Sequence, residues 1–186
     1  MKRLIPWLAA TLALALPLAA RAQMPQPPEV AAKSYLLLDM ASNQVLAERN
    51  ADAAADPASL TKLMTAYITF SKLKEGSLKP DQVVPVSTKA WRMEGSRMFI
   101  DLKTPVKVNE LIQGMIIQSG NDAAIALAEH TAGSEAAFVS LMNSYAQRIG
   151  MKHTHFMNPH GLSAEGHVST ARDLALMGRA MIREFP

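Results

Sequence analysis

The stretch from Ser59 to Phe70 restricts the possible fold more than any other part of the sequence. Its apolar residues recur at helical spacing, and Lys62 is its only charged residue. A helix that is apolar on nearly every side must be covered by other elements on nearly every side. We therefore expect a core built around this helix, which begins at Asp56-Pro57 with an N-cap and a proline at the first helical position.

Turn and capping residues outline the elements around this helix. Two short apolar runs between residues 34 and 50 flank Ala41-Ser42-Asn43, and Asn43 tolerates the positive φ of a hairpin turn, so we expect a β-hairpin. The stretch 77–104 is rich in turn residues and should form loops with one short strand at Gln82–Val86. Further helices are expected over 110–118 after the cap Asn109, over 122–132 before Gly133, over 134–150, and onward from a cap at Ser169 or Thr170.

The first 22 residues are typical of a secretory leader. Lys2 and Arg3 precede an uncharged apolar run, and Ala20-Arg21-Ala22 has the small-x-small pattern of a signal peptidase site. We expect a mature chain from Gln23, with an extended Pro-rich lead-in over 23–31 and a single domain over 32–186. The leader predicts export to the periplasm, and a chain without cysteine can fold there without disulfides.

The charge balance argues against one class of partner. The chain has 19 basic and 16 acidic residues, but Lys2, Arg3 and Arg21 belong to the leader. The remainder is therefore neutral overall, and it lacks the basic excess that nucleic-acid binding requires. No second apolar run reaches the roughly 18 residues of a membrane span.

Lys62 needs an explanation, because a cation near the N-terminus of a buried helix is disfavoured by the helix dipole and by desolvation. Ser59 precedes it by three residues and lies on the same side of the helix. Desolvation lowers a lysine pKa, so a neutral amine could act as the base toward a serine hydroxyl. The alternative is that Ser59 only satisfies a free backbone amide while Lys62 extends to water.

Two other polar groups could carry chemistry. Ser119-Gly120-Asn121 divides two apolar helical segments, and the glycine permits a tight turn that would present a hydroxyl and an amide to a cleft. It could equally be a helix end followed by the next N-cap. The four histidines His153, His155, His160 and His167 could suggest a zinc site, but no H-E-x-x-H pattern is present, and His160-Gly161 could instead shape a cleft wall.

The combination of these motifs resembles a known family. Ser59-Leu60-Thr61-Lys62 followed by Ser119-Gly120-Asn121 is similar to the S-x-x-K and S-x-N motifs of the serine penicillin-binding proteins and their β-lactamase relatives. The strings DPASLTKLMTAY and HGLSAEGHVSTARDLALMGRA resemble more specifically the low-molecular-weight, periplasmic D-alanyl-D-alanine carboxypeptidases. The resemblance covers nearly the whole chain from about Ser34. It implies an α+β fold of the penicillin-binding type, with helices packed on an antiparallel sheet.

The resemblance also implies roles for individual residues. Ser59 would attack the carbonyl between the two terminal D-Ala residues of a peptidoglycan stem peptide, with Lys62 as general base. Ser119 would relay a proton to the leaving amine, and Asn121 would bind the substrate amide. No metal or organic cofactor would be required, and β-lactams would acylate Ser59 because they imitate the D-Ala-D-Ala end.

One element of the family pattern is missing. The third motif, K-T-G, would come roughly a hundred residues after S-x-N, and the sequence ends at Pro186 before that point. We therefore expect residues 32–186 to be the N-terminal part of a longer catalytic domain. The later sheet strands, a C-terminal β-rich domain and an amphipathic anchor helix at the periplasmic face of the inner membrane would lie beyond it.

Several alternative functions use the same residues. A class A β-lactamase would need a glutamate to activate the deacylating water, and Glu165 is the only acidic residue between Met151 and Ala171. It lies in a Ser-Ala-Glu-Gly turn, which is typical of a solvated loop. A D,D-endopeptidase would use the same Ser-Lys pair. An inactive penicillin-binding fragment is the non-enzymatic alternative.

Overall fold

The computed structural model describes residues 29–186, so the predicted leader and most of the lead-in lie outside the described residues. Its elements in chain order are β1 (Tyr35–Leu38), β2 (Val45–Arg49), the 3-10 helix η1 (Ala58–Thr61), α1 (Lys62–Lys74), β3 (Val83–Val84), α2 (Thr88–Trp91), β4 (Val106–Lys107), α3 (Val108–Ile117), α4 (Asn121–Ala132), α5 (Glu135–Ile149) and α6 (Ala171–Glu184). The expected α+β class is confirmed, with antiparallel strands and mainly helical mass. None of the helices in this described part is long and apolar enough to cross a membrane.

The predicted N-terminal hairpin is confirmed. β1 and β2 pair antiparallel with Tyr35 opposite Arg49, and the register shifts between Leu37 and Leu38. Asn43 adopts a φ of 61°, the positive value that its place in the turn predicts.

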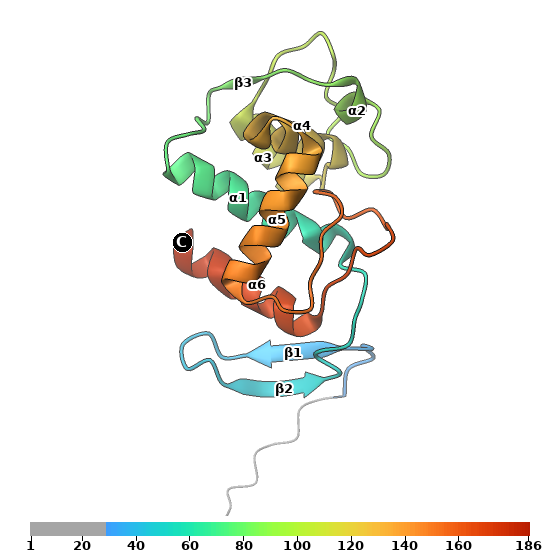
Figure 1. Cartoon of the computed structure of the whole chain (residues 1–186), viewed down its shortest axis with the longest axis vertical. Helices are drawn as coiled ribbons and strands as arrows, with labels where there is room; N and C mark the ends of the chain where they lie inside the picture. The colour runs from blue at the N-terminus through green and yellow to red at the C-terminus, as the bar shows by residue number, and fades with distance from the viewer. Residues whose placement is uncertain (1–28) are drawn as a thin grey trace, which may run out of the picture. The chain divides into compact units, whose positions relative to one another are not determined.

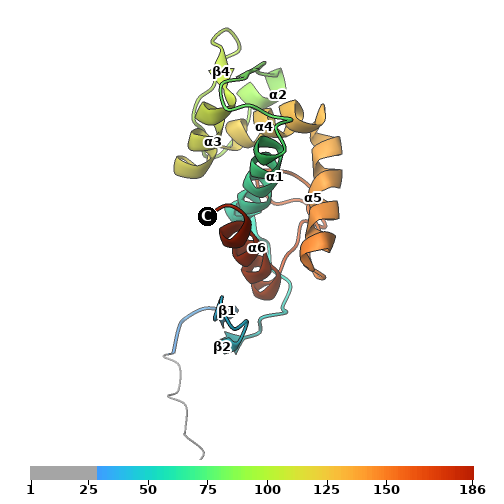
Figure 2. The ribbon, with the colours of Figure 1, turned by 90° about the vertical axis from the view of Figure 1, so that its left-hand side faces the viewer.

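Helix α6 lies between this hairpin and the other helices, as both Figure 1 and Figure 2 show. Arg172 in its first turn donates to Asp52 and Glu48, at 2.7 Å each, and so connects the helix to β2 and the residues after it. Near the other end of α6, Arg183 donates to the carbonyl of Met40 in the hairpin turn. Hydrogen bonds from both ends of α6 therefore connect the hairpin to the helical part.

Helix α4 is the most enclosed element of the helical part. Every residue from Asn121 to Ala128 is buried, and the helix contacts α1, α2, α3 and α5. Its alanines allow these neighbours to approach closely, because a small side chain adds little to the distance between helix axes. The gathering of α2, α3 and α4 is visible at one end of the helical part (Figure 1).

The predicted burial of α1 is confirmed. Lys62 and all residues from Met64 to Thr69 are buried. The helix lies between two apolar clusters, with Ala66 in the cluster that includes α3 and α4, and Met64 in the one that includes α5 and α6. It therefore joins the two halves of the core, which explains why nearly every side of it is apolar.

Most predicted boundaries are confirmed, and two details differ. The predicted strand is present as β3, which pairs antiparallel with β4, but residues 88–91 form helix α2 where the sequence predicts a loop. Its single turn, capped by Ser87, is too short to show a helical period. Helix α3 begins at Val108, before the predicted cap Asn109, because the Glu110 carboxylate accepts from Lys107 N–H at 2.7 Å and so occupies the third helical position.

Candidate active site

Ser59 lies in η1, a single 3-10 turn whose position is set by a hydrogen bond from the preceding segment and by close packing against a distant one. Asp56 accepts a hydrogen bond from Ala58 N–H at 2.9 Å, which turns the chain into η1. Ala58 has a φ of 45°, an uncommon value for a residue other than glycine. The backbone of Gly161 packs against this turn so closely that a Cβ there would lie 2.5 Å from the Ala58 carbonyl carbon. The position of Ser59 is thus set by a strained residue and by a glycine from a distant segment.

Lys62 is the first residue of α1, and its side chain points back toward Ser59. Its Nζ lies 3.4 Å from Ser59 Oγ and donates to the carbonyl of His160 at 2.7 Å. The side chain is buried, and this burial lowers the pKa of the amine to about 8. Roughly a tenth of the lysine is therefore neutral at pH 7 and could accept the Ser59 proton.

The segment that holds Lys62 is itself ordered by side-chain hydrogen bonds. Asn158 accepts from the N–H groups of His160 and Gly161, at 3.2 and 2.6 Å. Thr65, one turn after Lys62, donates to the carbonyl of Pro159 at 2.6 Å. Two successive carbonyls of this segment therefore face α1, and they bind a hydroxyl and the lysine amine.

His160 contributes its carbonyl to the site, while its ring is buried and accepts from Leu162 N–H at 3.1 Å. Burial, reinforced by the nearby Lys62 charge, lowers the pKa of this imidazole to about 4. A neutral ring beside Lys62 avoids a second cation in the site at neutral pH.

Ser119 occupies the tight turn that the sequence predicts between α3 and α4, with a φ of 55°. Ser59, Lys62 and Ser119 line the same pocket of about 290 Å³. The rest of its wall is apolar and comes from η1, α1, α3 and α6; these residues are Leu60, Leu63, Ala66, Phe70, Met115, Ile116 and Met181. The structure thus brings Ser119 together with Ser59, which precedes it by 60 residues, and with Lys62.

Asn121 does not line this pocket. It is 4% exposed, and its side-chain amide donates to the carbonyl of Glu94 at 2.7 Å while its backbone N–H donates to Ser96. Gly95 lies between these acceptors, where a Cβ would be 2.8 Å from the Asn121 amide nitrogen. In this structure the side chain therefore holds the loop around Gly95, and its binding to a substrate amide stays a prediction.

Asp122 is a structurally important residue that sequence reasoning missed. Its buried carboxylate accepts from the N–H groups of Met98, Phe99 and Ile100, at distances of 2.8 to 3.2 Å. These bonds fasten the 98–100 segment against α4 although Phe99 has a φ of 65°. Nothing in the sequence signals this contact, because an aspartate in a first helical turn is expected for capping alone.

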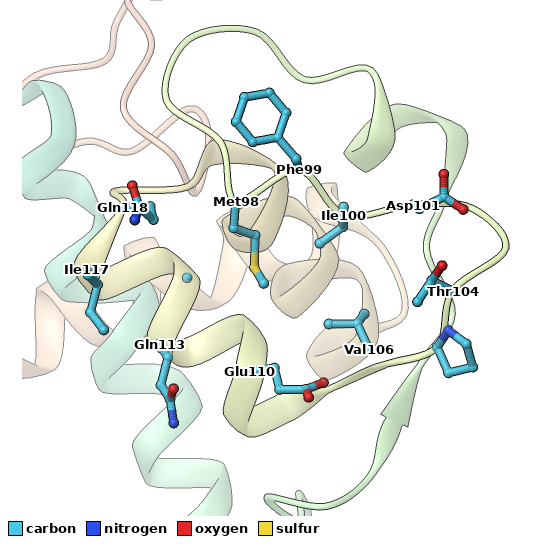
Figure 3. Close-up of a pocket in the computed structure, with 12 residues that line it drawn as sticks. Met98, Phe99, Ile100, Asp101, Thr104, Val106, Glu110, Gln113, Ile117 and Gln118 are labelled. Carbon is cyan, nitrogen blue, oxygen red and sulfur yellow. The ribbon is translucent and has the colours of Figure 1, made fainter.

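The segment fastened by Asp122 also covers a larger pocket of about 540 Å³ on α3, which is separate from the Ser-Lys pair. Figure 3 shows Met98 and Ile100 on one side of it and Glu110 and Gln113 on the other. The wall contains no serine, cysteine or lysine, so the candidate active site is the smaller pocket.

The remaining sequence candidates have other surroundings. Glu165 is exposed in a turn, as predicted for a solvated loop residue. Across residues 29–186 no three histidine, aspartate or glutamate side chains form a group that could hold a metal ion.

Comparison with known proteins identifies the family of the chain. Residues 21–186 match the peptidase S11 family, described as D-alanyl-D-alanine carboxypeptidase. The carboxypeptidase DacA of Escherichia coli K12 is 46% identical over 172 residues, which cover 89% of this chain and 43% of that protein. A D-alanyl-D-alanine endopeptidase of Pseudomonas aeruginosa is 34% identical, over 89% of this chain and 52% of that protein.

Solved structures are similar as well. The carboxypeptidase DacD of Francisella tularensis superposes with a TM-score of 0.85 at 42% identity, over 87% of this chain and 39% of that one. Penicillin-binding protein D2 of Listeria monocytogenes in its ampicillin-bound form has a TM-score of 0.76 at 29% identity, over 87% of this chain and 66% of that one. The chain spans less than half of the length of the E. coli carboxypeptidases it matches.

Proposed function

Because the chain belongs to the family of D-alanyl-D-alanine carboxypeptidases, we propose that it provides the Ser-Lys nucleophile of a serine D,D-carboxypeptidase. The enzyme removes the terminal D-Ala from peptidoglycan stem pentapeptides in the periplasm. The observation that carries the proposal is the approach of Ser59 Oγ to the buried amine of Lys62 in a pocket that Ser119 also lines. The leader-like sequence over residues 1–22 supports the periplasmic location.

The reaction begins when neutral Lys62 accepts the proton of Ser59 and the serine oxygen attacks the carbonyl between the two D-Ala residues. The C–N bond then breaks, and the leaving amine takes a proton from the lysine by way of Ser119. D-Ala departs, and the shortened peptide remains as an ester on Ser59. Lys62 then accepts a proton from a water molecule, whose oxygen attacks the ester carbonyl, and it returns this proton to Ser59 as the ester C–O bond breaks.

The structure favours Lys62 as the base for two physical reasons. Burial lowers its pKa to about 8, which puts the neutral form within reach at physiological pH. The carbonyl of His160 accepts one of its hydrogens and so orients the amine, which also lies 3.4 Å from Ser59 Oγ. The distance of 3.4 Å is long for proton transfer, and such contacts shorten when substrate binds.

β-Lactams should acylate the same serine, since their strained amide occupies the place of the scissile bond. The similarity to a penicillin-binding protein solved with ampicillin supports this part of the proposal. A D,D-endopeptidase that cuts cross-linked stem peptides is the second candidate, because a similar protein of P. aeruginosa carries that name.

Mass spectrometry tests the proposal directly. The protein, expressed from its complete reading frame, is incubated with benzylpenicillin, and any adduct is located by peptide mapping. We expect one penicilloyl group on Ser59 and none on a Ser59→Ala variant that keeps the wild-type circular dichroism spectrum. An adduct on another residue, or a folded protein without an adduct, would contradict the assignment. Release of D-Ala from a pentapeptide, compared with cleavage of a cross-linked dimer, separates the two peptidase activities.

A further inference from the structure

His167 lies behind the candidate nucleophile, in a short stretch that pairs with two other segments. Val168 exchanges backbone hydrogen bonds with His155, and Ser169 does so with Ala55, at 2.9 to 3.0 Å. This pairing places the His167 ring between the chain that leads into η1 and the segment that follows His155. The ring is 5% exposed and packs against Phe156 with the two centroids 6.0 Å apart.

Both ring nitrogens of His167 have a partner, and together the partners define the tautomer. Met157 N–H donates to Nδ1 at 2.9 Å, so Nδ1 carries no proton. The proton of the neutral ring is therefore on Nε2, which lies 2.8 Å from the hydroxyl of Thr61 and donates to it. A second proton on the ring would make Nδ1 a donor facing another donor.

The two partners belong to the two halves of the site. Thr61 is fully buried and lies between Ser59 and Lys62 in the chain. Met157 begins the segment whose carbonyls at Pro159 and His160 accept from α1 and Lys62. One imidazole thus joins the turn that carries the nucleophile to the segment that holds its base.

We propose that His167 is a positioning residue, whose neutral imidazole sets the distance between Ser59 and Lys62 by fastening Thr61 to Met157. The inference rests on the proposed function, since it concerns the efficiency of the same pair. His167 itself touches no substrate. Its contribution is to keep the long contact between the serine oxygen and the lysine amine from opening further.

The surroundings keep this ring neutral. Burial lowers the pKa of His167 below its usual value, and His155 adds to the effect, while the carboxylate of Asp56 opposes it. His160 also faces the ring, and it too is neutral at pH 7 because burial lowers its own pKa to about 4. Acid therefore breaks the bond to Met157 at a pH below that at which an exposed histidine titrates.

The test measures the rate at which a fluorescent penicillin acylates the folded protein, with a thermal melt for each variant. His167→Leu fills the space but makes neither bond, and Thr61→Val removes only the hydroxyl. At temperatures where both variants are folded, we expect each to lower the second-order rate constant of acylation at least tenfold. Thr61→Ser should restore it to within a few fold, because the hydroxyl returns. His155→Leu, the same change on an exposed neighbouring histidine, should leave the rate unchanged.

The pH profile gives a readout that a purely structural role would not alter. Below the pKa of His167, two protons oppose acylation, one on Lys62 and one on His167, so the logarithm of the wild-type rate should approach a slope of two. A His167→Gln variant cannot take up the second proton. Its slope should stay at one across the acid range in which the wild-type slope steepens, whatever its absolute rate.

The outcomes are separable. If wild-type protein carries no penicilloyl group on Ser59, the proposed function fails. If wild type is acylated there and His167→Leu and Thr61→Val react at its rate while melting at lower temperature, the inference alone is overturned, since His167 is then structural. A wild-type slope of one throughout the acid range would also overturn it. Nitrogen chemical shifts showing a proton on Nδ1 would refute the hydrogen bonds on which it is built.

Discussion

Gly161→Ala offers a direct test of how the nucleophile is positioned, because the packing at this residue leaves no room for a methyl group. A Cβ there would lie 2.5 Å from the Ala58 carbonyl carbon and 3.1 Å from Ser59 nitrogen. The Ala58 carbonyl oxygen would be closer still, and ordinary contact begins at 3.4 Å, so the turn must withdraw by at least about 1 Å. The Ser59 to Lys62 distance, already 3.4 Å, would then exceed hydrogen-bond reach.

A misplacement of this size costs about a hundredfold in rate where the reacting groups must be aligned. We therefore expect Gly161→Ala to lower the rate of penicillin acylation by about that factor in protein that is still folded. The measurement is stopped-flow acylation with a fluorescent penicillin, combined with circular dichroism of the same sample.

Gly76→Ala is the matched control. Gly76 has a φ of +75° and Gly161 one of +92°, so both substitutions place a side chain in the left-handed region, at a cost of about 1 kcal/mol. No heavy atom lies within 4 Å of a Cβ at Gly76. This variant should lose stability and keep the wild-type rate. If Gly161→Ala also keeps the wild-type rate, the close approach does not position Ser59 and our reasoning is wrong.

Three further predictions concern charge and burial. The acylation rate should rise about tenfold per pH unit up to pH 8 and then level, because Lys62 must lose its proton, and a flat profile between pH 6 and 8 would exclude it as the base. Asp122→Asn should lower the free energy of unfolding by about 1 to 3 kcal/mol in urea titrations, because an amide group then faces backbone donors, whereas the exposed Asp101→Asn should have little effect. The free energy of unfolding should fall as the pH drops from 6.5 to 4, and His160 should account for up to roughly 3 kcal/mol of this loss. The reason is that His160 binds a proton in the unfolded state over this range but stays neutral in the folded state. A His160→Gln variant with the same pH dependence would contradict this.

Local chemistry made much of this protein predictable from sequence. Ser134 and Thr170 cap the helices that follow them, and Gly133 and Gly150 end helices in the left-handed conformation, as residues of these types do in many proteins. The pairing of Ser59 with Lys62 was also predictable, because residues three apart on a helical turn share a side.

Contacts between distant segments were not predictable in this way. The approach of Gly161 to Ala58, the bond between His167 and Thr61, and the three backbone donors to Asp122 each join residues more than twenty positions apart. None of them leaves a periodic pattern, because each depends on where two separate segments meet. Asn121 illustrates the difference, since its place beside the turn follows from the sequence but its bond to Glu94 depends on a loop that precedes it by 27 residues.

The sequence by itself therefore determined the longer helices, the hairpin and the presence of a serine and a lysine on one helical turn, because capping, periodicity and turn chemistry act over a few residues. Only the tertiary structure decided that Lys62 is buried against the carbonyl of His160, that Ser119 joins the same pocket, and that a neutral imidazole secures the turn from behind. The physical reason is that desolvation and hydrogen bonding to a lysine amine depend on what surrounds it in space. A short motif can supply the amine, but its pKa is set by the segments that fold over it.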